Sequence, residues 1–289
     1  MKKLAIIVLI AGAIALTGCA ASTPSFTAED GIFLQKVGDY EVYMMVEAER
    51  DGNAGILVGA DEDVLNMYIP EDGFKHTANA YLIKAYGMNI MIDTGTGADG
   101  ILIDKIKKIG VGPEDIDGIL ITHLHRDHFG GLQMDGAANF PNATIFLNER
   151  ELEYFTVTNP NEAAIETLAL YESKIETFDL NSGMIEIFPG FFPIGAYGHT
   201  PGHTLYQIES GDDKMLIIGD LLHLALVQFA IPEISATFDI DPIEAAATRR
   251  QVLNYAAGNN IPIGGMHIVY PGIGKVETDG DGFKFTPSK

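Results

Sequence analysis

Short apolar or alternating runs recur along much of this 289-residue chain and are separated by glycine-rich and polar segments. Their period and length predict β-strands at residues 40–46, 80–84, 89–93, 118–122, 144–147, 205–209 and 215–219. Apolar residues at helical spacing predict helices at residues 98–109 and 242–257. Gly110 and Gly258 are expected to end these helices, and Pro242 suits a first turn. Strands alternating with helices predict a mixed α/β fold in which helices cover sheets.

The densest group of metal-ligand residue types follows the predicted strand 118–122, in the segment THLHRDHFGG. His123 and His125 alternate, so an extended segment or the turn that closes it can direct both rings at one ion. Asp127 and His128 come at the end of that turn and can reach a second ion. Imidazole suits zinc, iron, nickel or copper, and a carboxylate beside it extends the range to manganese or cobalt. Two metal sites are therefore expected.

Further ligand candidates stand where later apolar runs end. His203 closes the segment GHTPGH, Asp220 follows MLIIG, and His267 follows GGM. A binuclear site needs about three to five protein ligands per ion. These three residues supply the ligands that the first segment lacks.

The order HxHxDH, GHTPGH, strand-ending aspartate and late histidine resembles the metallo-β-lactamase superfamily. The resemblance implies a four-layer αββα sandwich with two metals at one edge. It implies that the first metal is held by His123, His125 and His203. The second metal is then held by Asp127, His128 and His267, and Asp220 bridges the two. His199 is then expected to make supporting hydrogen bonds.

A closer resemblance, over about residues 79–287, is to methyl parathion hydrolase and its lactonase and arylesterase relatives. It rests on the segments FPNATI, GHTPGHT, GDLL followed by VQF, FDIDPIEAAATRRQ, HIVYPGIG and GFKFTP. The resemblance implies that Phe155 and His223 line the substrate pocket. An apolar residue is more typical of methyl parathion hydrolase where this chain has His223, which counts against efficient organophosphate hydrolysis.

The first residues have the pattern of a secretion signal. Lys2 and Lys3 precede an apolar stretch at 4–16, which is shorter than the ~20 residues of a membrane-spanning helix. The segment LTGC that follows resembles a bacterial lipobox. We expect a signal peptide at residues 1–18, a lipid on Cys19, and a tether at 19–28. The protein is then an extracytoplasmic lipoprotein anchored to a membrane. Cys19 is the only cysteine, so an internal disulfide is excluded.

The charge balance narrows the class of partner. The chain has 18 basic and 40 acidic side chains and a formal net charge of -22. No basic footprint that could neutralise phosphates is visible, so nucleic acid is not an expected partner. The candidate ligands are spread over 123–267 without a linker between them, which predicts a single hydrolase domain at residues 29–289. The sequence leaves the oligomeric state open, a homodimer included.

The ligand set points to hydrolysis. Two cations can lower the pKa of a shared water from 15.7 to roughly 7, so a bridging hydroxide can attack without a protein nucleophile. The chain lacks a GxSxG motif, in agreement with such chemistry. Asp127 and Asp220 are the catalytic candidates, and zinc is the expected ion, with manganese, iron and cobalt as alternatives.

The expected substrates are small molecules: lactones, aryl esters or similar neutral esters, with phosphotriester hydrolysis as a further activity. Two alternatives remain. One is β-lactamase-type amide hydrolysis, against which the bridging Asp220 counts, because the resemblance places such a residue in esterase branches. The other is a surface lipoprotein that binds without catalysis, against which a complete ligand set counts.

Overall fold

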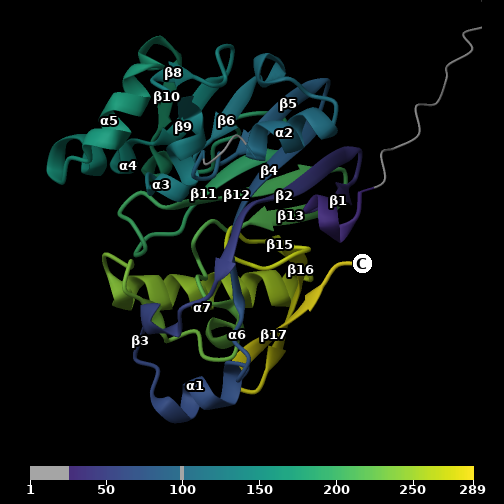
Figure 1. The fold of residues 1–289 in the computed structure, drawn as a ribbon, viewed down its shortest axis with the longest axis vertical. Helices are drawn as coiled ribbons and strands as arrows, with labels where there is room; N and C mark the ends of the chain where they lie inside the picture. Colours follow the sequence, from purple (N-terminus) through teal and green to yellow (C-terminus); the bar gives the residue numbers. More distant parts are fainter. Residues whose placement is uncertain (1–25, 98–100) are drawn as a thin grey trace, which may run out of the picture.

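The computed structural model describes residues 26–97 and 101–289, and its core is a pair of stacked β-sheets with helices on the outside (Figure 1). The first sheet has seven strands in the order β1-β2-β4-β5-β6-β9-β10. Their bounds are Ile32–Val37, Tyr40–Asp51, Lys75–Ala85, Met88–Ile92, Gly118–Leu120, Thr144–Asn148 and Ile175–Phe178. β5, β6, β9 and β10 are parallel neighbours, whereas β1, β2, β4 and β5 pair antiparallel.

The second sheet has six strands in the order β11-β12-β13-β15-β16-β17. Their bounds are Phe191–Gly195, Thr204–Ser210, Asp213–Ile217, Ile263–Gly264, Ile273–Asp279 and Gly282–Pro287. Only β13 and β15 are parallel in this sheet. Two short ribbons complete the strands: β3 (Leu57–Val58) with β14 (Ser235–Ala236), and β7 (Gln133–Met134) with β8 (Ala137–Ala138).

The described helices are short except for one. They are α1 (Glu62–Tyr68), α2 (Ile101–Lys108), α3 (Arg126–Phe129), α4 (Glu149–Glu153), α5 (Glu162–Ala169), α6 (Ala225–Gln228) and α7 (Pro242–Asn259). A π-helical turn at Tyr154–Thr158 continues α4. Among the described residues, no helix is both long enough and apolar enough to cross a bilayer.

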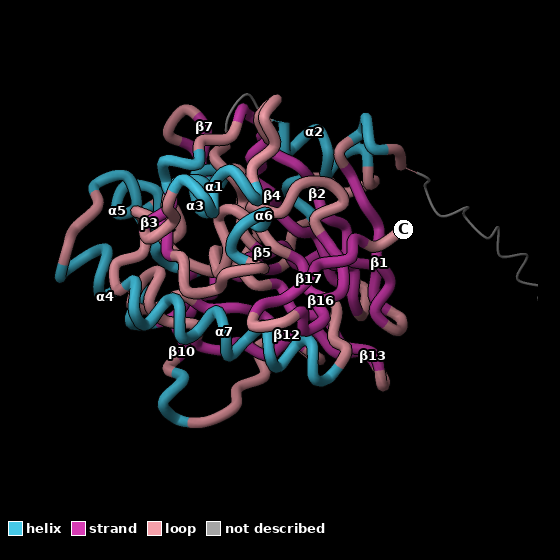
Figure 2. The backbone as a smooth tube through the Cα atoms, turned by 90° about the horizontal axis from the view of Figure 1, so that it is seen from below, coloured by secondary structure: helices cyan, strands magenta, loops and turns pink. Residues whose placement is uncertain are grey.

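Strand alternation divides the core into layers. On β4, Tyr81 and Ile83 enter the layer between the sheets, whereas Ala80 and Leu82 face the layer that also holds Leu102 of α2. Because successive side chains of a strand point to opposite faces, one strand serves two cores. A third apolar layer packs α7 onto the second sheet, and Figure 2 shows α7 extended along its strands. The expected αββα sandwich is confirmed.

The predicted strands overlap β2, β4, β5, β6, β9, β12 and β13, but β2 continues to Asp51 and β4 already begins at Lys75. Gly110, with φ 84°, follows α2 as expected. The end predicted for the last helix is wrong, because α7 continues past Gly258 to Asn259 and is capped by Asn260, which takes the left-handed conformation at φ 53°. Asparagine tolerates this conformation and can replace glycine as a helix terminator. The start of helix 98–109, the signal peptide and Cys19 lie outside the described residues.

Candidate metal centre

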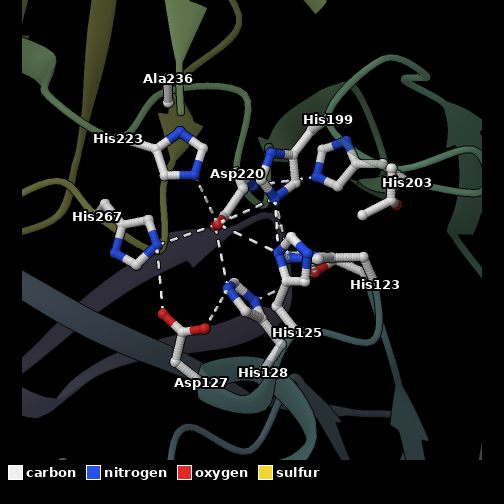
Figure 3. A network of polar contacts seen from close by, with 12 residues as sticks. His123, His125, Asp127, His128, His199, His203, Asp220, His223, Ala236 and His267 are labelled. Atoms are coloured by element: carbon white, nitrogen blue, oxygen red, sulfur yellow. Dashed lines mark hydrogen bonds and ion pairs between the residues drawn. The ribbon is translucent and has the colours of Figure 1, made fainter. Parts of the chain in front are cut away.

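Six of the seven expected ligands, together with His199, meet at one edge of the sandwich, although they come from both sheets (Figure 3). His123 and His125 follow β6, and Asp127 and His128 lie on α3. His199 follows β11, Asp220 follows β13, and His267 follows β15. The ends of strands in neighbouring sheets therefore bring together side chains that are far apart in sequence. Most of these side chains are buried, and Asp127 is the most exposed carboxylate among them.

Three imidazoles form the first cluster. His199 Nε2 lies 3.2 Å from His123 Nε2 and 3.0 Å from His125 Nδ1, and the latter two atoms are 3.0 Å apart. Asp220 Oδ2 lies 3.7 Å from His123 Nε2 and 3.5 Å from His199 Nε2. These four residues could hold one metal ion.

The second cluster faces the other side of Asp220. His128 Nε2 and His267 Nε2 each lie 3.7 Å from a carboxylate oxygen of Asp127. Asp220 is 3.1 Å from both rings, through Oδ1 to His128 and through Oδ2 to His267. Asp220 thus stands between the two clusters and is placed to bridge two ions.

The structure corrects the expectation for the GHTPGH segment. His203 Nδ1 donates to the carbonyl of Ala196 at 2.8 Å, and its Nε2 accepts from the backbone N–H of Asp220 at 3.0 Å. Both ring nitrogens are therefore committed, and His203 belongs to no cluster of potential ligands in the described chain. His199, expected to be a supporting residue, takes the position assigned to His203. A Cβ at Gly219 would lie 2.4 Å from His203 Nε2, so this close approach requires glycine.

The convergent atoms fit a cation better than they fit one another. His128 Nε2 and Asp220 Oδ1 are buried, and neither has a hydrogen-bond partner although they are 3.1 Å apart. Leaving such polar atoms unsatisfied in the interior is costly. Imidazole nitrogens and carboxylate oxygens are the donors that zinc and related divalent ions prefer. The donor set therefore fits two metal ions.

The remaining ring nitrogens are held by partners behind the clusters. His128 Nδ1 contacts Asp93 Oδ2 at 2.7 Å, and His199 Nδ1 contacts Asp239 Oδ1 at 2.9 Å. His267 Nδ1 contacts the carbonyl of Thr77 at 2.6 Å. Such contacts fix ring orientation and tautomer, so Nε2 faces the cluster. Asp93, which was expected to be structural support, also accepts from Thr122 N and Oγ1.

Electrostatics favour neutral rings in the first cluster and an ionised Asp220 between the two clusters. Burial lowers the pKa of His199 to about 3 and that of His125 to about 4, so both rings are neutral and can offer a lone pair. Burial works to raise the pKa of Asp220, but the surrounding histidines, His128 first, hold it well below its usual value. Burial opposes protonation of His128, but Asp220, Asp93 and Asp127 raise its pKa well above the ordinary value. Carboxylates that favour a proton there also favour a bound cation.

The two expected pocket residues lie beside the clusters. The ring of Phe155, in the π-helical turn, has its centroid 5.8 Å from that of His125. His223 Nε2 is 3.1 Å from Asp220 Oδ2, and its ring is 4.7 Å from His199 and 5.4 Å from His267. Its Nδ1 is buried without a partner. His223 is thus close enough to contact a ligand at the clusters.

Sequence reasoning missed three residues around the site. The ring of His76, on β4, lies 4.5 Å from that of His267. Asp239 holds His199, as described above. Buried Glu151 accepts from Leu124 N at 2.8 Å, Thr200 Oγ1 at 2.7 Å and Gly202 N at 2.9 Å. It therefore ties together the two loops that carry the first cluster. No local sequence pattern marks His76, Asp239 or Glu151; only the GHTPGH segment, which Glu151 contacts, was recognisable in the sequence.

Comparison with known families shows to which protein family the chain belongs. The sequence profile described as Metallo-beta-lactamase superfamily matches residues 74–260. The chain belongs to the metallo-β-lactamase superfamily. The matched range holds every residue of the two clusters except His267.

The chain is similar to a lactonase and to a hydrolase of known structure. An N-acyl homoserine lactonase of Bacillus cereus is 26% identical over 162 residues, which are 48% of this chain and 60% of the lactonase. The alignment thus spans less than two thirds of that relative. The crystal structure of hydrolase AbOPH in the beta lactamase superfamily has 28% identity and a TM-score of 0.82, and the match covers 90% of this chain and 98% of AbOPH.

A second solved structure is AidC, a dizinc quorum-quenching lactonase in complex with a product, N-hexanoyl-L-homoserine. It has 26% identity and a TM-score of 0.78, with the same coverage of 90% of this chain and 98% of AidC. Family membership, these relatives and the two His/Asp clusters together support a metal-dependent hydrolase.

Proposed function

We propose that this protein is a binuclear metal-dependent lactonase. The observation that carries the proposal is Asp220, which lies within 3.1–3.7 Å of ring nitrogens from both clusters. Lactonase relatives, one of them a dizinc enzyme with a homoserine product, support the substrate class. Lactones, with N-acyl homoserine lactones first, are the proposed substrates. Aryl esters and phosphotriesters are secondary ones.

The proposed ligands divide between the two ions. The first ion would be held by His123, His125 and His199, and the second by Asp127, His128 and His267, with Asp220 shared. Bound divalent ions, zinc first, would supply Lewis acidity and lower the pKa of water to roughly 7. Nδ1 contacts behind His128, His199 and His267 keep these rings aimed at the centre.

Two side chains have proposed roles in handling the substrate. Asp127, a member of the second cluster, has a carboxylate that is 31% exposed, so it can also accept a proton and pass it to the leaving alkoxide. His223 presents Nε2 beside Asp220 and can donate a hydrogen bond to a substrate oxygen. Ring opening of a lactone needs both actions, because charge develops first on the carbonyl oxygen and then on the leaving oxygen.

The surroundings of the centre suit an apolar, neutral substrate. Phe238 is 48% exposed and its ring lies 5.5 Å from that of His223. Ile240, also partly exposed, donates its N–H to the carbonyl of His199. The exposed Phe238 ring, beside His223, can contact the acyl part of a substrate. The net charge of -22 disfavours polyanionic substrates such as nucleic acids.

We further propose that residues 29–289 act as one domain outside the cytoplasm, anchored through a lipid on Cys19. The apolar stretch at 4–16 and the segment LTGC support this proposal. Membrane fractionation and mass spectrometry of the protein isolated from its source test it. A wholly soluble protein without lipid contradicts the anchor. Sedimentation of the soluble domain tests whether it forms a homodimer.

A substrate panel tests the lactonase proposal. Residues 26–289 are loaded with zinc, manganese or cobalt and assayed with N-hexanoyl homoserine lactone, an aryl ester, methyl parathion and nitrocefin. His123→Ala serves as the inactive control. We expect the highest kcat/KM on the lactone. Preference for nitrocefin supports the β-lactamase-type alternative instead, and no turnover of any substrate by the fully metal-loaded protein supports a binding role.

A further inference from the structure

A buried chain of polar contacts leads from α7 to the first cluster. Arg249 and His199 are at most 2% exposed, and the carboxylate of Asp239 between them is fully covered. Asp239 Oδ1 contacts His199 Nδ1 at 2.9 Å. Asp239 Oδ2 accepts from Ala236 N at 2.9 Å and lies 3.4 Å from Arg249 Nη2. His199 is thus the inner end of an arginine–aspartate–histidine series.

The other donors of the guanidinium are also engaged. Arg249 Nε donates to the carbonyl of Leu221 at 2.6 Å, and Nη1 donates to those of Pro232 at 2.8 Å and Ile234 at 3.0 Å. Leu221 directly follows Asp220. One side chain from α7 therefore holds the segment that carries Asp220 and the segment that carries Asp239.

We propose that Arg249 and Asp239 are positioning residues for the first metal ion, which they orient through His199 and the Asp220 segment. Asp239 keeps the proton of His199 on Nδ1, so the lone pair on Nε2 faces His123 and His125. Arg249 keeps Asp239 in place and fixes the backbone beside Asp220. The proposal rests on the metal centre of the proposed function, but it concerns ring tautomer and metal affinity rather than substrate.

The contacts of Asp239 provide a discriminating substitution. Both of its oxygens face donors only: Ala236 N–H and Arg249 on one side, and His199 Nδ1–H on the other. In Asp239→Asn, the amide oxygen is expected to face the side with two donors. The amide NH2 then faces His199 Nδ1 and forces the ring proton onto Nε2, where it blocks metal binding. Asp239→Ala leaves the tautomer of His199 free.

The test measures metal affinity by chelator competition and the His199 tautomer by 15N NMR of the metal-free protein. For Asp239→Asn we expect the Nε2–H tautomer and a loss of affinity for one of two ions of about 10–100-fold. Asp239→Ala should lose less affinity. A merely structural role predicts the reverse order, because asparagine has the shape of aspartate. That order, or an unchanged tautomer in Asp239→Asn, overturns the proposal.

A second pair of variants keeps Asp239 intact. Arg249→Lys retains the charge, but a single ammonium cannot replace contacts to Leu221 and Asp239 that leave from different guanidinium nitrogens. We expect weaker binding of one ion and a lower kcat with little change in KM. The matched control is Arg250→Lys, because Arg250 is its neighbour on α7 and pairs with Glu233 at the surface. Equal metal affinity in the two folded variants overturns the role of Arg249.

Discussion

His203 Nε2 accepts a hydrogen bond from the backbone N–H of Asp220 at 3.0 Å, while its Nδ1 donates to Ala196. This ring therefore acts on the backbone of the bridging residue and has no nitrogen left for a metal ion. His199, four residues earlier, has Nε2 within 3.2 Å of two other imidazoles. The two histidines of one segment thus have different tasks, and variants can separate them.

His199→Ala should remove one of the two ions and abolish hydrolysis, since it deletes a proposed ligand of the first cluster. His203→Ala should retain two ions at saturating metal, with an affinity lowered about 10–100-fold by the lost support behind Asp220. Plasma emission spectroscopy of the dialysed proteins measures the stoichiometry. Full metal content in His199→Ala, together with loss of an ion in His203→Ala, would reverse the assignment.

Asp220→Asn should affect both ions, because Asp220 contacts both clusters. Asp93→Asn should lower chiefly the affinity for the second ion, because Asp93 contacts only His128 among the proposed ligands. Titration of each metal-free variant with zinc, followed by calorimetry, distinguishes two weakened sites from one. Near-native turnover of Asp220→Asn with two tightly bound ions is incompatible with the bridge.

Glu151→Gln should lower both the free energy of unfolding and the affinity for the first metal ion. The carboxylate accepts three hydrogen bonds, whereas a glutamine turns an NH2 group toward at least one of those donors. An unsatisfied buried donor costs about 1–3 kcal/mol of unfolding free energy. Denaturant unfolding measures this loss, with Glu149→Gln at the exposed start of α4 as the control. Equal stability of the two variants would remove Glu151 from the support of the site.

His223→Leu should shift preference toward aryl phosphotriesters, because it replaces a polar ring beside Asp220 with an apolar side chain. An added apolar contact changes selectivity by about 1–3 kcal/mol, or roughly 10–200-fold. The measured quantity is the ratio of kcat/KM for methyl parathion and a lactone, at two ions per protein in both proteins. An unchanged ratio places His223 outside the specificity pocket.

Metal removal should lower thermal stability, since a chelator leaves convergent, buried polar atoms without a partner. Binding to the native state stabilises it by about 4 kcal/mol at a metal concentration 1,000 times Kd. Differential scanning calorimetry of the metal-loaded and chelator-treated domain measures the shift, and His123→Ala is the control. A melting temperature that does not respond to chelator contradicts a structural contribution from the ions.

The sequence could predict the layers and most of the site. The positions of β4 and β5 could be predicted because both faces of these strands are buried. Their alternate side chains enter two different apolar layers, so the strands are apolar runs in the sequence. The HxHxDH segment identified four neighbouring cluster members because short spacing alone brings them together. The choice between His199 and His203 could not be made locally, since both follow glycine in GHTPGH.

Long-range geometry decides that choice. Ala196, just after β11, donates its backbone N–H to the His203 carbonyl and accepts from His203 Nδ1, which leaves Nε2 of this ring facing Asp220 N. Gly198 takes φ 117° and approaches Ala245 of α7, so His199 follows a sharp bend. Glu151, Asp239 and Arg249 gain their roles from contacts between segments that no local pattern connects.

Anomalous X-ray diffraction at the zinc edge, from crystals of the zinc-loaded domain, tests the central claim most directly. We predict two anomalous peaks on either side of the Asp220 carboxylate. His199 Nε2 should bind the first, and His203 should still be hydrogen-bonded to Asp220 N. A single peak, or a peak bound by His203 with His199 turned away, contradicts a binuclear centre built on these residues.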